Sequence, residues 1–219
     1  MIEPNIEYQG RQTKRRGSEQ RRQAILEAAL RIIVTEGIRS VRHRAVAREA
    51  DVPLSATTYY FKDITDLISD TFTFFAERAI KEVITPFKEA TFAMLSSAAD
   101  GKDSPGKRAE LLDQLADAVC QFIQFEVTEQ HDHLIAEQAF LYEAILNPRL
   151  AELATHYVQE QRNALTQALE LLGSRTADLD GEILMSVFFR MENRLLTDDS
   201  MDIGQVREHV RRALELLVP

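Results

Sequence analysis

Residues 40–62 combine the side chains that proteins use to contact duplex DNA. Arg44 carries a planar guanidinium that can donate two hydrogen bonds to O6 and N7 of guanine. Leu54, Ala56 and the methyl groups of the nearby threonines are short apolar groups that fit thymine methyl groups. Donors for phosphate oxygens surround them: Arg39, Arg42, His43, Arg48, Tyr59, Tyr60 and Lys62. These residue types therefore favour DNA binding.

Two short helical patterns position these side chains. The first covers residues 44–50, with a short apolar face, and the second covers about 54–60. The tight junction Ala50-Asp51-Val52-Pro53 separates them. A short helix, a tight turn and a second short helix are the layout of the helix-turn-helix. We therefore expect the remaining chain to present this unit to DNA or to control its presentation.

Longer helices should flank this unit. One is predicted over residues 18–36, with Ser18 as an acceptable N-cap and Gly37 at its C-terminal end. Its apolar residues recur at the spacing of one helix face: Ile25, Ala28, Ala29, Ile32 and Ile33. Another begins at Asp63, with no loop after Phe61, so any tilt of this helix should move the helix-turn-helix. Pro86 should kink or end it.

Charge is distributed unevenly along the chain. The net charge is −9, but residues 1–62 hold 12 Lys and Arg against 7 Asp and Glu, a net of +5. The remainder holds 14 against 28, a net of −14. The positive charge thus lies in the same part of the sequence as the predicted helix-turn-helix, which would contact the phosphates of DNA. The acidic remainder should point away from DNA.

The rest of the chain predicts an all-α fold. Residues 96–106 are the clearest loop, and no segment sustains the two-residue alternation of a strand. Five helical patterns follow that loop, at about 111–126, 133–146, 149–172, 178–196 and 203–218. The sequence therefore predicts a helical protein throughout.

Composition excludes several classes of protein. Cys120 is the single cysteine, which excludes an internal disulfide and a multi-cysteine zinc site and suits a reducing cytoplasm. The N-terminus lacks the apolar core of a signal peptide, and no apolar run is long enough to span a membrane. We therefore expect a cytoplasmic protein. Because Cys120 lies beside an apolar stripe, we interpret it as a buried small hydrophobe.

A metal site and an enzyme active site find little support. His131 and His133 lie two residues apart, which does not place both on one helix face, and no further ligand is near them in sequence. The chain has no Gly-rich phosphate loop and no plausible nucleophile with a base. We therefore expect no metal, no cofactor and no catalysis.

The order of these features resembles the tetracycline-repressor (TetR/AcrR) family of bacterial transcriptional regulators. The resemblance rests on a basic N-terminal segment, a long first helix with a terminal Gly, the run RAVAREADVPLSATTYYF and then K-D-x-x-D-L. It covers about residues 22–75. It implies a helix-turn-helix domain over 18–62 and a helical effector-binding and dimerisation domain over 63–219. Residues 1–17 would be a flexible basic arm, which either contacts DNA or is a solvated terminus.

The resemblance also implies roles for individual residues. Leu54, Ser55, Ala56 and Thr58 would lie on the recognition helix facing base edges, and Arg44 could reach a base from the preceding helix. Tyr59 and Tyr60 would lie near phosphates. The full expected DNA-contact set is Arg42, His43, Arg44, Leu54, Ser55, Ala56, Thr58, Tyr59, Tyr60 and Lys62.

Departures from the family pattern occur at three positions, and some of the expected aromatic contacts have another explanation. Asp51 replaces a usual turn Gly, Arg42 a capping Thr or Ser, and Ile64 a phosphate-contacting Lys. Core packing is the alternative role for Phe61 and for one of the two tyrosines.

The second half would bind an effector and a second subunit. A Phe-lined cavity between the central helices would favour a hydrophobic or aromatic molecule. The expected ligand-binding residues are Phe72, Phe75, Phe122, Phe125, Glu126, Phe140, Phe188 and Phe189. The last two helices carry apolar stripes that the resemblance assigns to a homodimer interface. Packing within the protein's own core is the alternative for these phenylalanines and for both stripes.

Together these features lead to one hypothesis with two rivals. The hypothesis is a homodimeric, ligand-responsive repressor that binds a palindromic DNA operator and is released by a small molecule. The first rival is an effector-independent DNA-binding protein of the same fold, acting in chromosome organisation or division. The second rival, an all-helical enzyme, has no supporting residues.

Overall fold

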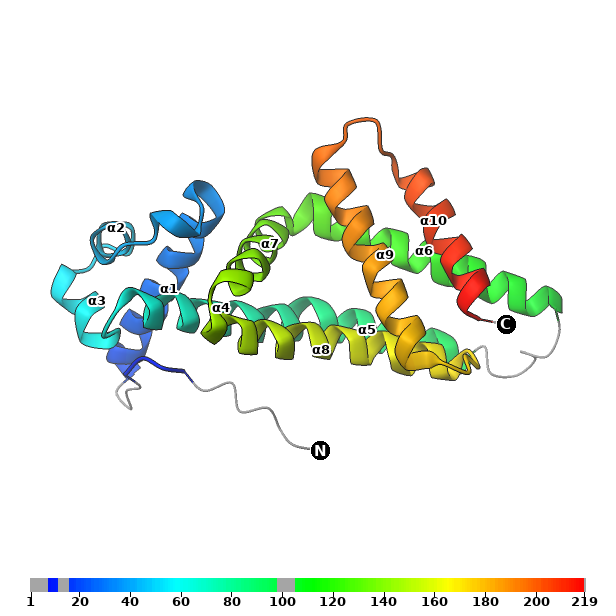
Figure 1. The fold of residues 1–219 in the computed structure, drawn as a ribbon, viewed down its shortest axis with the longest axis horizontal. Coiled ribbons are helices and arrows are strands. Elements are labelled where there is room, and N and C mark those ends of the chain that lie inside the picture. The colour runs from blue at the N-terminus through cyan, green and yellow to red at the C-terminus, as the bar shows by residue number, and fades with distance from the viewer. Residues whose placement is uncertain (1–7, 12–15, 98–104, 219) are drawn as a thin grey trace. The chain divides into compact units, whose positions relative to one another are not determined.

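The computed structural model describes residues 8–11, 16–97 and 105–218, and within these ranges every regular element is helical (Figure 1). The predicted all-α fold is therefore confirmed. The helices are α1 (Arg16–Glu36), α2 (His43–Glu49), α3 (Leu54–Tyr60), α4 (Ile64–Ala79), α5 (Thr85–Ser97), α6 (Pro105–Glu129), α7 (His131–Leu146), α8 (Pro148–Leu171), α9 (Ala177–Thr197) and α10 (Ile203–Leu217). The predicted loop at 96–106 lies mostly outside the described residues.

The chain packs as two compact units, each with its own core. The first contains α1 to α4, α7 and the first part of α8 (residues 1–79 and 132–157). The second contains α5, α6, the rest of α8, α9 and α10 (residues 80–131 and 158–219). The functional boundary expected after Lys62 remains a prediction, because packing does not test which residues bind DNA.

The core of the first unit begins with the apolar face of α1. All five residues predicted for that face are buried, and Val46, Phe61 and Leu67 are fully buried. The carboxylate of Asp63 accepts the backbone N–H of Asp66 at 2.8 Å and so caps α4, as predicted. The predicted N-cap at Ser18 is wrong. The helix starts at Arg16, and the Ser18 hydroxyl bonds the Tyr60 hydroxyl at 2.7 Å.

Aromatic rings fill the other part of the first unit. Phe72 of α4 stacks on Phe140 of α7, with ring centroids 4.6 Å apart. Phe75 packs against both of these rings, and Tyr157 packs against Phe72 and Phe75. The Tyr157 hydroxyl donates to Glu137 at 2.8 Å. The ring cluster therefore links α4, α7 and the first part of α8.

The second unit is built on α6, α9 and α10. Its core includes most of the apolar residues predicted for the last two helices, among them Leu184, Phe188, Met191, Val206, Val210 and Leu214. These residues therefore face the protein's own core, which was the alternative to a dimer interface, and the homodimer itself stays a prediction. Outside the core, Arg207 and Arg211 of α10 bind Asp113 of α6 at 3.2 Å and 2.9 Å.

A π-helical turn, Ile80–Ile84, joins α4 to α5. Pro86 was expected to kink or end the helix; it does not end it, because α5 runs through Pro86. Proline has no N–H for the carbonyl four residues earlier, and its ring crowds that carbonyl. A wider π turn placed just before Pro86 accommodates both effects.

Candidate nucleic-acid interface and ligand cavity

The turn between α2 and α3 has the backbone geometry of a tight helix-turn-helix. Asp51 has a φ of 52° and is the one non-glycine residue with positive φ in the described ranges. Asp tolerates this left-handed conformation better than most residues. The N–H of Val52 then donates to Ala47 O at 3.0 Å, and Pro53 occupies the N-cap position of α3 with a φ of −59°.

The N-terminal end of α2 lacks a side-chain cap. Arg42 occupies the N-cap position with extended backbone and makes no capping hydrogen bond. The missing capping bond agrees with the presence of Arg42 at a position where the family has a capping Thr or Ser. The Arg42 side chain is exposed and donates to Val41 O at 3.3 Å. It therefore remains at the surface beside α2, where a phosphate could be met.

One side of α3 faces solvent. Leu54, Ser55, Thr58 and Tyr59 are exposed, whereas Thr57 and Tyr60 are buried and Ala56 is half-buried. Exposed positions 54, 55, 58 and 59 follow the spacing of one helix face. A helix that presents short polar and apolar side chains along one face suits docking in a major groove.

Tyr60 was expected to contact DNA, but the structure places its side chain in the core. Its side chain is 3% exposed, and its hydroxyl bonds both the side chain and the backbone carbonyl of Ser18. Tyr59 is 50% exposed. The prediction that one of the two tyrosines packs the core is thus confirmed, as is the core position of Phe61.

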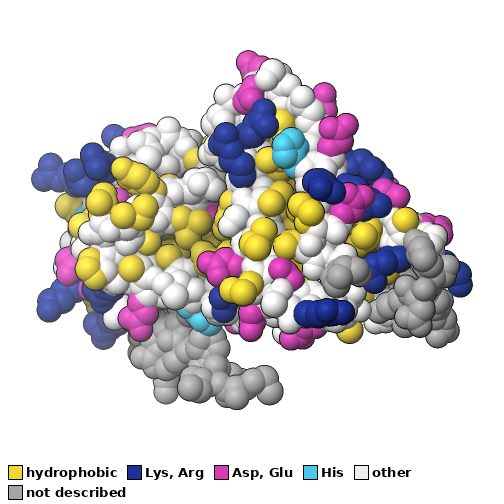
Figure 2. All heavy atoms as spheres, turned by 45° about the vertical axis from the view of Figure 1, so that its right-hand side comes forward, with side chains coloured by type: hydrophobic (Ala, Val, Ile, Leu, Met, Phe, Trp, Pro, Cys, Tyr) yellow, Lys and Arg dark blue, Asp and Glu magenta, His cyan; other side chains and the backbone are white. Residues whose placement is uncertain are grey.

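Exposed cations border this face. Arg39, Arg44, Arg48 and Lys62 are exposed, and His43 is half-buried. Figure 2 shows Lys and Arg side chains gathered at the end where Figure 1 draws α2 and α3. These cations offer several donors to phosphate oxygens beside the exposed face of α3.

Residues 8–11 were expected to belong to a flexible arm, but they pack against the first unit. The backbone N–H groups of Gln9 and Gly10 donate to the carboxylate of Asp70, and that of Arg11 donates to Tyr60 O. The sequence did not predict these contacts, because Asp70 lies about 60 residues away from Gln9 and Gly10. Nothing in the sequence distinguishes Asp70 from any other acidic residue of a helix.

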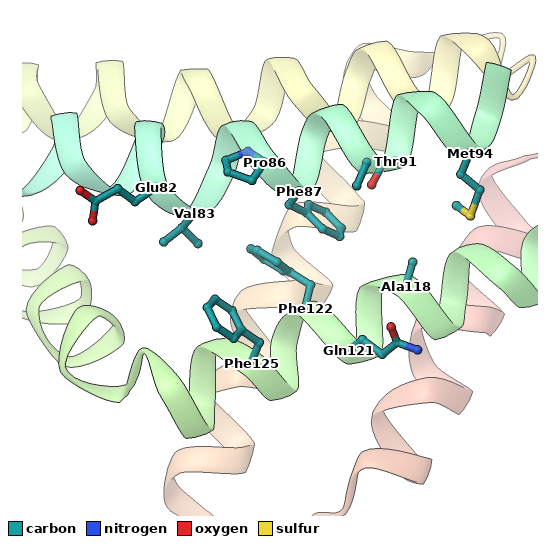
Figure 3. Close-up of a pocket in the computed structure, with 11 residues that line it drawn as sticks. Glu82, Val83, Pro86, Phe87, Thr91, Met94, Ala118, Gln121, Phe122 and Phe125 are labelled. Carbon is teal, nitrogen blue, oxygen red and sulfur yellow. The ribbon is translucent and has the colours of Figure 1, made fainter. Parts of the chain in front are cut away.

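A separate cavity of about 520 Å³ lies in the second unit, between the π turn, α5 and α6. Phe87 and Phe122 stack at 4.0 Å between centroids, and Figure 3 shows Phe125 pointing into the same space. The other lining residues are Glu82, Val83, Pro86, Ala90, Thr91, Met94, Ala118 and Gln121. This space is large enough for a small aromatic molecule.

The expected ligand-binding residues do not lie together. Phe122 and Phe125 line the cavity. Phe72, Phe75 and Phe140 form the ring cluster of the first unit, Phe188 is in the core of the second, Phe189 is half-buried and Glu126 is buried. Phe87 was missed, since no pattern in α5 distinguishes a ring that lines a cavity from one that packs a core.

His133 and Cys120 are both packed side chains. The His133 ring stacks on Phe75 at 4.7 Å, and burial lowers its pKa to about 4. Cys120 is buried as predicted, and burial raises the pKa of its thiol. No cluster of three His, Cys, Asp or Glu side chains that could hold a metal occurs in the part of the chain that the structure describes. No described helix is long and apolar enough to cross a membrane.

Comparison with known proteins finds similarity to solved structures of transcriptional regulators. No model of a known protein family matches the sequence, and no curated protein matches it significantly. The multidrug binding protein EbrR, complexed with imidazole, is 25% identical, with a TM-score of 0.60 over 91% of this chain and 90% of that one.

Further solved structures agree with this similarity. EbrR complexed with ethidium is 26% identical, with a TM-score of 0.58 over 89% of this chain and 98% of that one. SCO1917 from Streptomyces coelicolor A3, a member of the TetR family, is 25% identical, with a TM-score of 0.61 over 91% and 99%.

Proposed function

We propose that this chain is a transcriptional regulator of the TetR type, as its fold and its helix-turn-helix suggest, and that it acts as a homodimeric repressor released from a palindromic operator by a small aromatic effector. The proposed regulatory role is in keeping with the solved structures that the chain resembles. The observation that carries the proposal is the solvent-facing side of α3, bordered by exposed cations.

In the proposed complex, α3 enters the major groove. Arg44 reaches a guanine, Leu54, Ser55, Ala56 and Thr58 face base edges, and Arg42, His43, Tyr59 and Lys62 contact phosphates. A single unit of this size makes few base contacts. Two copies related by a two-fold axis would read half-sites about 34–36 Å apart, or a multiple of that distance.

For the dimer, we propose the outer faces of α9 and α10. Their inner faces fill the core of the second unit. Leu179 and Ile183 lie one turn apart on α9 and are 64% and 50% exposed, and Leu216 is exposed on α10. Exposed apolar side chains on neighbouring helices are typical of a protein interface.

For the effector, we propose the cavity between α5 and α6. EbrR has been crystallised with ethidium, proflavin and malachite green, which are aromatic cations. In this chain the stacked Phe87 and Phe122 offer aromatic faces, and the described lining residues include the acid Glu82 and no Lys or Arg. This lining favours an aromatic molecule that is neutral or cationic.

The proposed release acts through a continuous helix. Val83 of the π turn lines the cavity, and the same helix leads back through α4 to Asp63, directly after the helix-turn-helix. An effector that binds one arrangement of this helix better than another shifts the population toward the arrangement it prefers. The spacing of the two recognition helices then changes, and both half-sites can no longer be engaged together.

The proposal is tested by a mobility-shift assay on the DNA that flanks the chain's own gene, with excess mixed-sequence competitor. We expect a specific complex at physiological salt concentration. This complex should be lost when malachite green is added. A specific complex that no aromatic cation or neutral aromatic compound releases would favour an effector-independent DNA-binding protein. Equal binding to flanking and competitor DNA would contradict the proposed operator recognition.

A further inference from the structure

Residues 8–11, which we name the strap, are fixed to the first unit through three consecutive backbone N–H groups. Those of Gln9 and Gly10 donate to Oδ1 and Oδ2 of Asp70, at 2.6 Å and 2.9 Å. That of Arg11 donates to the carbonyl of Tyr60 at 2.8 Å, at the C-terminal end of α3. The strap therefore holds Arg11 beside the recognition helix.

Asp70 is a fully buried carboxylate, and the strap completes its coordination. Nη2 of Arg22, which is itself 4% exposed, donates to Oδ2 at 2.7 Å. A buried ion pair is stable only when its remaining hydrogen-bonding positions are filled. The two N–H groups from the strap fill such positions on the Asp70 carboxylate.

Gly10 is the residue that lets the strap approach so closely. A Cβ atom at this position would lie 2.7 Å from Oδ2 of Asp70 and 2.8 Å from ring carbons of Phe61. Asp70 and Phe61 are both fully buried and cannot easily move away. Any larger residue would push the strap off Asp70.

The strap presents Arg11 on the exposed face of α3. The Arg11 guanidinium lies 4.4 Å from the centroid of the Tyr59 ring. Tyr59 is exposed and lies one helical turn after Ser55 on the same face. Within the described ranges, no acidic side chain forms an ion pair with Arg11, so its charge is available to a ligand.

We propose that Arg11 and Tyr59 form a binding site for a phosphodiester of the DNA backbone, with Gly10 and Asp70 as positioning residues. The guanidinium and the phenol both donate hydrogen bonds to phosphate oxygens. Because the strap is already ordered, little conformational entropy is lost when DNA binds. The inference rests on the proposed DNA-binding function and adds a contact that lies outside the helix-turn-helix.

The test measures the salt dependence of binding to mixed-sequence duplex DNA by fluorescence anisotropy. Arg11→Ala should reduce the slope of log K against log salt by about 0.9 and weaken binding about eightfold at 0.1 M salt, since one phosphate contact is lost. Arg11→Lys should keep the slope, because the charge remains. Arg175→Ala, which removes an exposed arginine of the second unit, should behave like wild type.

A second variant tests the positioning role. Gly10→Ala should reproduce the slope of Arg11→Ala although Arg11 is intact, and the double variant should be no weaker than Arg11→Ala. Additive losses in the double variant, or wild-type binding by Gly10→Ala, would overturn the positioning role. The melting temperature, measured alongside, separates this effect from general loss of the fold.

Two outcomes distinguish this inference from the proposed function. If wild type binds duplex DNA and Arg11→Ala has the same slope and affinity, the phosphate site is overturned and the proposed function stands. If wild type binds no duplex DNA, the proposed function fails and the site fails with it.

Discussion

Arg44 and Lys62 are both exposed cations near α3, but they are expected to contact different parts of the DNA. Arg44→Ala should cost about 1–3 kcal/mol of binding free energy and relax the preference at one base pair, because a bidentate contact to guanine is lost. Lys62→Ala should weaken all sequences alike and lower the salt slope by about 1. Titration of an operator and its single-base variants separates the two, and an equal loss on every DNA would contradict base reading by Arg44.

His133 should make the stability of the protein depend on pH. Its folded-state pKa of about 4 is below the ordinary value of 6.5, because burial and the nearby Arg78 disfavour the charged ring. Between these values the unfolded chain binds more protons than the folded one, so stability falls as pH drops from above 6.5 toward 4. From pH 7.5 to pH 5 this amounts to about 2 kcal/mol.

Replacing the histidine should remove that dependence. His133→Phe keeps a ring against Phe75 and should lose less stability between pH 7.5 and pH 5 than wild type does, measured by urea unfolding. His209→Phe, at an exposed histidine of α10, serves as the control. An unchanged pH dependence in His133→Phe would show that other groups cause it.

The adjacent tyrosines show what the sequence could predict about single residues. Helix geometry required Tyr59 and Tyr60 to face different ways, so one of them was expected in the core. That Tyr60 and not Tyr59 is the core residue depends on Ser18, which lies 42 residues earlier. The Ser18 hydroxyl forms a hydrogen bond with the Tyr60 hydroxyl. Such long-range partners leave no periodic signal in the sequence.

Among the elements, α5 and α6 are the ones expected to hold the effector. Phe122→Ala should weaken effector binding about 5- to 10-fold, because a stacked aromatic partner is lost from the cavity. Isothermal titration with malachite green measures this, and DNA affinity without effector should not change. Phe92→Ala, a half-buried phenylalanine of α5 outside the cavity lining, is the matched control. Equal effects of the two substitutions would contradict the proposed location.

Most element boundaries follow from local signals in the sequence. Asp63 caps α4, α7 ends at Leu146 just before Asn147-Pro148, and Gly173 has a φ of 86° after α8, all as the residue types predict. The π turn before Pro86 was not predicted. Proline shows that the hydrogen-bond ladder must change there, but not whether the helix bends, stops or widens.

At the scale of the whole molecule, the sequence predicted the fold and the helix-turn-helix better than the faces that bind partners. The apolar stripes of α9 and α10 look alike whether they pack inside the chain or against a second copy. Leu184 and Val210 turned out to be core residues, whereas Ile183, next in sequence to Leu184, is exposed. Only the packing of α6 against both helices decides between the two roles.

Because Ile183 is exposed in the single chain, a substitution there can test the proposed dimer without disturbing the core. Ile183→Asp should yield monomers in sedimentation equilibrium, since an uncompensated charge in an apolar interface is costly. Operator affinity should fall with it, because one half-site makes few base contacts. Gln114→Asp, at an exposed position of α6, should remain dimeric. A dimeric Ile183→Asp variant would place the interface elsewhere.

Selection of binding sites from random duplex DNA tests the central claim most directly. The account predicts an enriched palindrome whose half-sites are about 34–36 Å apart or a multiple of that distance. It further predicts that Arg44→Ala relaxes one base pair in each half-site. Recovery of random sequence, or of a motif without two-fold symmetry, would contradict operator recognition by a homodimer.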